Sequence, residues 1–170
     1  MGLIGFGKAA NEVAKRLTAF GMKIVFYDPY IEESKHEATK VDLDYLLQTS
    51  DVISIHVNKT KETQNLIDSE ALNMIKEGGI IVNTSRGGII DEKSLFELVD
   101  DKKIIFGGLD VYEKEPPVVG EFFSSSNIVT TPHLGASTKE AQLKAGKQTA
   151  ENVKDILNGD LSSVLNYLKK

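Results

Sequence analysis

The sequence predicts an α/β fold, a doubly wound parallel sheet with helices on both faces. Short runs rich in isoleucine and valine alternate with segments of helical periodicity, which is typical of parallel strands buried between helices. At 170 residues the chain is long enough for one domain with a substantial core. Its 41% hydrophobic and 26% charged residues are those of an ordinary globular protein.

The first half of the chain begins with a strand and an amphipathic helix. The run GLIGF (2–6) is the first expected strand, and residues 8–20 follow with helical periodicity. One face of this helix would carry the apolar side chains of Ala10, Val13, Ala14, Leu17 and Phe20. Gly21 suits the end of the helix. We then expect a strand in KIVFYD (23–28), a helix in LDYLLQT (43–49) and a strand in DVISIHV (51–57).

The second half repeats this alternation. A helix in SEALNMI (69–75) has Ser69 as its expected N-cap, and a helix in DEKSLFELVDD (91–101) has acids in its first turn. A long helix over 137–157 closes the pattern, and the irregular stretch 112–126 is expected to be a surface excursion. The strands expected between these helices are GGIIVNTS (78–85), IIFGGLDV (104–111) and NIVTTP (127–132).

Composition excludes several classes of function. A net charge of −5 offers no attraction to nucleic acid or to an anionic membrane surface. The chain has no cysteine, and therefore no disulfide framework or thiolate chemistry. It shows neither an apolar run long enough to span a bilayer nor a secretory leader. We expect a cytoplasmic protein with no nucleic-acid or membrane partner and no metal.

A glycine-rich turn between the first strand and the first helix predicts a dinucleotide-binding (Rossmann) domain. Gly5 allows the tight turn, Gly7 lets the backbone approach a pyrophosphate, and Ala10 allows close packing of helix on strand. The free N–H groups at the helix start attract phosphate. The alternative is that two glycines in a strand–helix turn reflect turn chemistry alone.

A second signal, Asp28, agrees with the first. It ends the second expected strand, 21 residues after Gly7, where such folds place an acid on the adenosine ribose. A carboxylate there would repel a 2′-phosphate, and no arginine follows in DPYIEESK, so the sequence predicts NAD rather than NADP. The alternative is that Asp28 and Pro29 simply begin a turn.

Polar side chains follow the later strands, where an open parallel sheet binds its ligands. Arg86 could hold a carboxylate or carbonyl oxygen with its planar fork, or be an ordinary surface arginine. His133 could exchange a proton near neutral pH, or be a hydrogen-bonded loop residue. Glu115 could pair with that histidine and hold its ring, or be one surface acid among several. Together they suggest hydride transfer at an alcohol carbon. His36, in ESKHEA, is expected on a solvated face.

Four ordered runs resemble the D-isomer-specific 2-hydroxyacid dehydrogenases, over nearly the whole chain from Gly2 to about Gly159. They are SDVISIHVNKTKETQNLID, GGIIVNTSRGGIIDEKSL, GGLDVYEKEPP and NIVTTPHLGASTKEAQ. The last most resembles the D-3-phosphoglycerate dehydrogenases within the family. The resemblance implies that Arg86 holds the substrate carboxylate and carbonyl, that His133 is the acid–base residue, and that Glu115 is its partner. Formate dehydrogenases of the superfamily carry glutamine in place of Glu115, which favours a hydroxyacid substrate.

The resemblance also implies a set of cofactor contacts, with NAD as the cofactor. The pyrophosphate would meet the backbone of Lys8 and Ala9, and His56 and Val57 would line the cofactor groove. Thr84 and Ser85 would line the nicotinamide side. The remaining positions implied in cofactor binding are Gly5, Gly7, Asp28, Arg86, Asp110 at the nicotinamide carboxamide, and the loop from His133 through Gly135 to Ala136.

Two departures from the family pattern affect the functional prediction. Asn58 and Lys59 stand where members usually carry proline and a hydrophobic residue, on the adenosine side of the groove. Members also have a substrate domain built mainly from residues ahead of the glycine turn. We therefore expect residues 1–157 to form the NAD-binding domain and 158–170 to rejoin a domain that this chain lacks. Two hypotheses remain, the catalytic NAD-binding half of a dehydrogenase and a non-catalytic NAD-binding or dimerisation module.

Members of this family commonly pair through their NAD-binding domains. The segment between Glu115 and His133 carries an apolar cluster in a predicted loop, at Val118, Val119, Phe122 and Phe123. Such a cluster predicts a homodimer interface if it is exposed. The alternative is that these side chains fold back on their own core.

Overall fold

The computed structural model describes residues 1–34, 36–117 and 125–161, in two compact units. The first unit runs from Met1 to Pro132 and the second begins at His133. Val118, Val119, Phe122 and Phe123, the expected interface cluster, lie outside the described residues. None of the helices in the described part is both long and apolar enough to cross a membrane.

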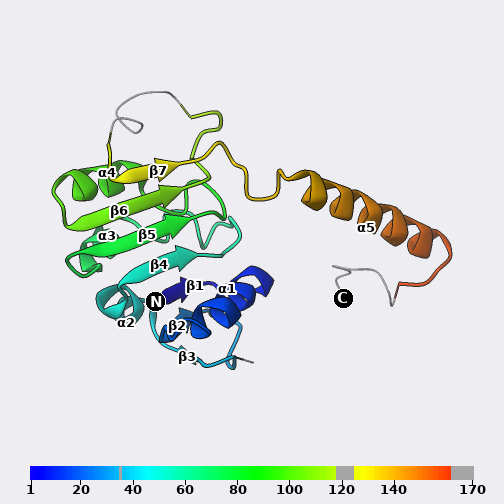
Figure 1. The fold of residues 1–170 in the computed structure, drawn as a ribbon, viewed down its shortest axis with the longest axis horizontal. Coiled ribbons are helices and arrows are strands. Elements are labelled where there is room, and N and C mark those ends of the chain that lie inside the picture. The colour runs from blue at the N-terminus through cyan, green and yellow to red at the C-terminus, as the bar shows by residue number, and fades with distance from the viewer. Residues whose placement is uncertain (35, 118–124, 162–170) are drawn as a thin grey trace. The chain divides into compact units, whose positions relative to one another are not determined.

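The described strands of the first unit form one seven-stranded sheet in the order β3-β2-β1-β4-β5-β6-β7 (Figure 1). All neighbouring strands pair in parallel. The strands are β1 (Gly2–Ile4), β2 (Ile24–Tyr27), β3 (Ala38–Lys40), β4 (Val52–Ile55), β5 (Gly79–Asn83), β6 (Ile104–Leu109) and β7 (Ile128–Thr130). The predicted doubly wound parallel sheet is therefore confirmed.

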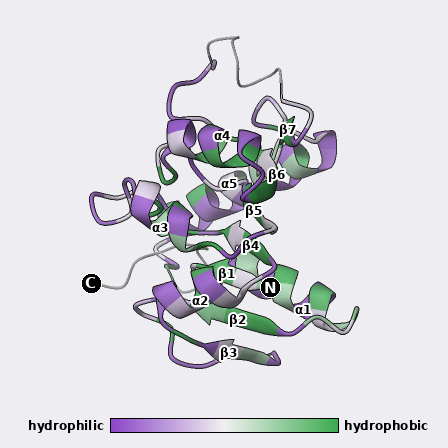
Figure 2. Cartoon of the chain, turned by 90° about the vertical axis from the view of Figure 1, so that its left-hand side faces the viewer, coloured by the Kyte–Doolittle hydropathy of each residue, from purple (hydrophilic) through white to green (hydrophobic). Residues whose placement is uncertain are grey.

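Helices cover both faces of the sheet, but unequally. On one face α2 (Leu43–Thr49), α3 (Ser69–Met74) and α4 (Glu92–Asp100) pack on the larger core, which includes Ile53 and Ile81. On the other face α1 (Lys8–Thr18) packs on Leu3, Ile24 and Phe26 of β1 and β2. Val82 and Phe106 point to the α1 side and are only partly buried, and Val129 is 52% exposed there. In Figure 2, β2 is coloured as hydrophobic over most of its length, whereas α1 mixes hydrophobic and hydrophilic residues.

Three local expectations were wrong, each for a physical reason. Phe20 lies past the end of α1 and is 83% exposed, because the Met22 and Gly21 N–H groups bond to Leu17 and Thr18 and close the helix there. The N-cap of α3 is Asp68 rather than Ser69, since its side chain accepts the Ala71 N–H at 2.9 Å. The short edge strand β3 was missed because its sequence, Ala-Thr-Lys, has no apolar run.

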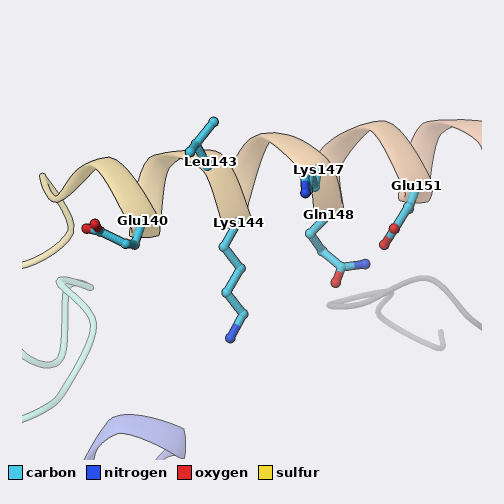
Figure 3. Close-up of a pocket in the computed structure, with 6 residues that line it drawn as sticks. All are labelled: Glu140, Leu143, Lys144, Lys147, Gln148 and Glu151. Carbon is cyan, nitrogen blue, oxygen red and sulfur yellow. The ribbon is translucent and has the colours of Figure 1, made fainter.

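The second unit contains α5 (Lys139–Leu157), which begins two residues later than expected. Thr138 caps it by accepting the Ala141 N–H at 3.1 Å. None of its side chains is buried, and Leu143, Val153, Ile156 and Leu157 are each at least half exposed. A hollow along α5 is lined by charges of both signs and one leucine, at Glu140, Leu143, Lys144, Lys147, Gln148 and Glu151 (Figure 3). These groups are typical of a helix surface and do not converge on a ligand.

Candidate functional site

The order of the strands reverses between β1 and β4, so the two halves of the sheet wind in opposite directions from that point (Figure 1). In such sheets a crevice opens beyond the carboxyl ends of the two strands and binds the ligand. The loops after β1 and β4 meet closely here. A Cβ on Gly5 would lie 2.7 Å from Val57 Cγ1 and 2.9 Å from the His56 carbonyl, and Gly5 has a φ of +85°. Glycine is therefore required at this turn.

The turn after β1 is open at the start of α1. Gly7 is exposed, and a Cβ placed on it would meet nothing within 4 Å. It is also the N-cap of α1 and makes no side-chain capping bond, so a ligand can accept the first N–H groups of the helix. Lys8 and Ala9 form the exposed first turn, while Ala10 is buried against β1 and β2. The burial of Ala10 agrees with the close packing of helix on strand expected there, while the phosphate-binding roles of Gly7, Lys8 and Ala9 stay predictions.

Asp28 connects the end of β2 to this turn. Its Oδ2 accepts the Phe6 N–H at 2.8 Å, between the two glycines. Its Oδ1 accepts the N–H groups of Tyr30 at 2.8 Å and Ile31 at 3.1 Å, so Asp28 also initiates the turn that was considered as its alternative role. A carboxylate has about four acceptor positions, and Oδ2 keeps capacity for a ribose hydroxyl.

His56 and Val57 follow β4, on the other side of the crevice. The His56 ring contacts the Ser54 hydroxyl through Nε2 at 3.0 Å. Burial lowers the pKa of the His56 ring, which favours its neutral form. This geometry suits a residue that lines a groove rather than one that carries a charge.

Asn83, which was not among the residues predicted from the sequence, organises the turn after β5. Its side chain is 1% exposed and bonds in three directions. Nδ2 donates to the Arg86 carbonyl at 2.9 Å, and Oδ1 accepts the Ser85 N–H at 3.0 Å and the Ser85 hydroxyl at 2.9 Å. Thr84 and the Arg86 side chain are exposed on this turn. One feature of the sequence could have identified Asn83. It is an asparagine at the last position of a buried strand, directly before a predicted turn.

Gly87 brings the Arg86 turn against the loop that follows β6. A Cβ on Gly87 would lie 1.7 Å from the Tyr112 carbonyl oxygen and 2.6 Å from the Glu113 nitrogen. Only glycine permits this approach of two backbones. Glu115 lies on the same loop, exposed, and its Oε1 accepts the Tyr112 N–H at 3.2 Å. The fold therefore places the Arg86 turn and the Glu115 loop in direct contact.

The loop after β6 is also tied to the end of β7. Asp110 is 5% exposed and accepts the Thr131 hydroxyl at 2.5 Å, while its N–H donates to the Asn83 carbonyl at 3.0 Å. The Tyr112 hydroxyl donates to the Thr131 carbonyl at 2.9 Å, and burial raises its pKa. Asp110 was expected at the nicotinamide; here it also joins the ends of β5, β6 and β7.

His133 is the first residue of the second unit, and the loop expected to close over the cofactor runs from it to Ala136. Its φ is +56°, an uncommon value for a residue with a side chain. The Ser137 hydroxyl donates to its carbonyl at 3.3 Å. Gly135 and Ala136 are exposed on the same turn.

The strand reversal, the glycine turn and the acid at the end of β2 together define a dinucleotide-binding α/β domain. Comparison with known proteins identifies the family of this domain. Residues 1–135 match the model of the D-isomer specific 2-hydroxyacid dehydrogenase NAD-binding domain. The chain belongs to this family, and its cofactor is NAD.

Individual relatives align with this chain over most of its length. The hydroxypyruvate reductase of Thermotoga maritima is 49% identical over 156 residues, 90% of this chain and 51% of that protein. The D-3-phosphoglycerate dehydrogenase of Methanocaldococcus jannaschii is 43% identical over 166 residues, 95% of this chain and 32% of that protein. The D-mandelate dehydrogenase of Rhodotorula graminis superposes with a TM-score of 0.85 at 33% identity, over 91% of this chain and 46% of that one. The chain spans 51%, 32% and 46% of the lengths of these three proteins, respectively.

Proposed function

We propose that this chain is the NAD-binding, catalytic part of a dehydrogenase that interconverts a small D-2-hydroxy acid and its 2-oxo acid. The observation that carries the proposal is the Arg86 turn. An exposed guanidinium stands at the carboxyl end of β5, on a turn fixed by the buried Asn83 and packed through Gly87 on the Glu115 loop. A fixed, exposed arginine at the ligand-binding edge of the sheet suits a substrate carboxylate.

The chemistry assigns one task to each side chain. Arg86 binds the substrate carboxylate and carbonyl oxygens and orients the reacting carbon. His133 takes the hydroxyl proton in oxidation and returns it in reduction, and Glu115 pairs with His133 and holds its ring. NAD, when bound, accepts the hydride from the hydroxyl-bearing carbon. Backbone N–H groups at Gly7, Lys8 and Ala9 bind its pyrophosphate, since α1 begins there without a side-chain cap.

Within this class we propose 3-phosphoglycerate as the substrate. The ending TPHLGASTKEAQ and relatives such as the Methanocaldococcus jannaschii D-3-phosphoglycerate dehydrogenase support this choice. The Thermotoga maritima relative is named for hydroxypyruvate, also a three-carbon 2-oxo acid, but one without phosphate. The choice between the two therefore depends on groups that recognise a phosphate.

The proposed domain organisation follows from the same relatives. We propose that residues 1–157 form the NAD-binding domain and that 158–170 contact a substrate domain. A cytoplasmic homodimer formed through the NAD-binding domain belongs to this proposal. The competing hypothesis is a module that binds NAD and dimerises without catalysis.

The test compares cofactor binding with turnover. The full chain is titrated with NAD and NADP, then assayed for NADH formation with 3-phosphoglycerate and with D-glycerate. Turnover of 3-phosphoglycerate that Arg86→Ala abolishes, while NAD affinity stays within about twofold, supports the proposal. Arg86→Lys is the matched variant, because it keeps the charge and loses the bidentate fork. Tight NAD binding with no turnover of either acid, alone or after adding a relative's substrate domain in trans, would favour the non-catalytic module.

A further inference from the structure

Glu92 lies where three parts of the proposed active site come together. It is the first residue of α4, directly after the N-cap Asp91, whose Oδ1 accepts the Ser94 N–H at 3.2 Å. This cap fixes the start of the helix and with it the direction of the next side chain. The Glu92 carboxylate is only partly exposed.

The Glu92 carboxylate receives a backbone N–H group from the loop after β6. Its Oε1 accepts the Glu113 N–H at 2.6 Å, two residues before Glu115. Glu92 itself follows the Arg86 turn along the chain, after residues 87–91. Gly88 of that turn also lies near the same loop, since a Cβ on it would be 3.7 Å from Glu113 Cγ. The Glu92 side chain thus connects the segment after β5 to the loop after β6.

The charges around Glu92 differ from those of an ordinary surface carboxylate. Burial and the neighbouring Glu113 carboxylate raise the pKa of Glu92, while the Glu113 N–H and Lys59 favour its charged form. Partial burial of a carboxylate costs less free energy while its hydrogen bond stays in place. Asp91 already caps α4, so capping the helix does not require the bond from Glu92 to Glu113.

We propose that Glu92 is a positioning residue that locks the Arg86 turn to the Glu115 loop, so that the two side chains are presented to the substrate as one rigid unit. The inference rests on the proposed function of Arg86 and Glu115. The Gly87–Tyr112 contact sets how closely the two backbones approach. Glu92 holds the Glu113 amide beside that contact, and so ties the loop after β6 to the segment that carries Arg86.

The test uses three variants of the full chain. Glu92→Ala removes the acceptor, and Glu92→Gln keeps one neutral oxygen that can still accept an N–H. Glu97→Gln is the matched control, since Glu97 lies on the same helix, is exposed, and reaches Lys93 only at 3.9 Å. Amide hydrogen exchange at Glu113 measures the hydrogen bond to Glu92 directly. NADH affinity, and kcat and KM for the 2-oxo acid, measure how the loss of this contact affects cofactor binding and turnover.

For Glu92→Ala we expect exchange at the Glu113 amide to rise at least about tenfold. kcat/KM for the 2-oxo acid should fall about 100-fold, with NADH affinity within about twofold, because misplacing a substrate-binding group by about 1 Å costs that much. Glu92→Gln should lie between wild type and Glu92→Ala, and Glu97→Gln should match wild type. Unchanged exchange at the Glu113 amide would overturn the proposal, as would a parallel loss of NADH affinity. If the wild-type chain shows no turnover, the proposed function fails, and the exchange result alone decides whether Glu92 holds the loop after β6.

Discussion

The contact between Gly87 and Tyr112 gives the sharpest prediction about this protein. In Gly87→Ala the new Cβ would lie 1.7 Å from the Tyr112 carbonyl oxygen, where 3.0 Å is the shortest distance that real Cβ atoms show. The two backbones must therefore separate by about 1.3 Å. Neither is a flexible side-chain end that could move aside. We expect a loss of about 3 kcal/mol in the free energy of unfolding, the upper end of the usual cost of overpacking.

The same displacement should reach the proposed chemistry, because it moves the Arg86 turn away from the Glu115 loop. A misplacement of about 1 Å corresponds to about a 100-fold loss of turnover. Urea unfolding gives the stability, and NADH oxidation with the 2-oxo acid gives the rate. The control is Gly108→Ala on β6, whose Cβ would be 3.5 Å from Val82, an ordinary contact, and which should change stability by less than about 1 kcal/mol. Wild-type stability and turnover in Gly87→Ala would refute the argument.

Three further predictions concern the cofactor and the histidines. Asp28→Ala should weaken NAD and narrow the NAD-over-NADP preference, since the carboxylate that repels a 2′-phosphate is lost; an unchanged ratio of the two dissociation constants would rule out the ribose role. His133→Ala should abolish turnover and leave NAD affinity within about twofold, and a large loss of NAD binding would instead mark a structural residue. Because burial lowers the pKa of His56, the unfolded state takes up a proton below about pH 6.5 that the folded state does not. The free energy of unfolding should therefore fall as pH drops below that value, and less steeply in His56→Gln; parallel pH profiles for the two proteins would contradict the assignment.

Sequence reasoning recovered the strands and helices where the pattern is local. Isoleucine- and valine-rich runs predicted every strand except β3, which lies at the sheet edge and needs no apolar run. It failed at helix ends, where Asp68 and Ser69 are both good caps and only the backbone geometry selects between them.

The proposed site residues divide in the same way. The glycine turn, Asp28 and Arg86 could be proposed from the sequence because each has a fixed place relative to a strand end. Asn83 was passed over although its side-chain partners, Ser85 and Arg86, lie on its own turn. Glu92 was passed over because its partner is a backbone group of another loop, which leaves no pattern in the sequence.

The sequence by itself determined the class of fold, the NAD-binding turn and the family, because strand periodicity and glycine spacing are properties of consecutive residues. Only the tertiary structure decided how the ends of β5, β6 and β7 are joined. The bond from the Asp110 N–H to the Asn83 carbonyl, the Gly87–Tyr112 contact and the Glu92–Glu113 bond lie between segments whose approach is set by the pairing of the strands. That pairing brings the Arg86 and Glu115 segments, 29 residues apart in the chain, into contact at one edge of the sheet.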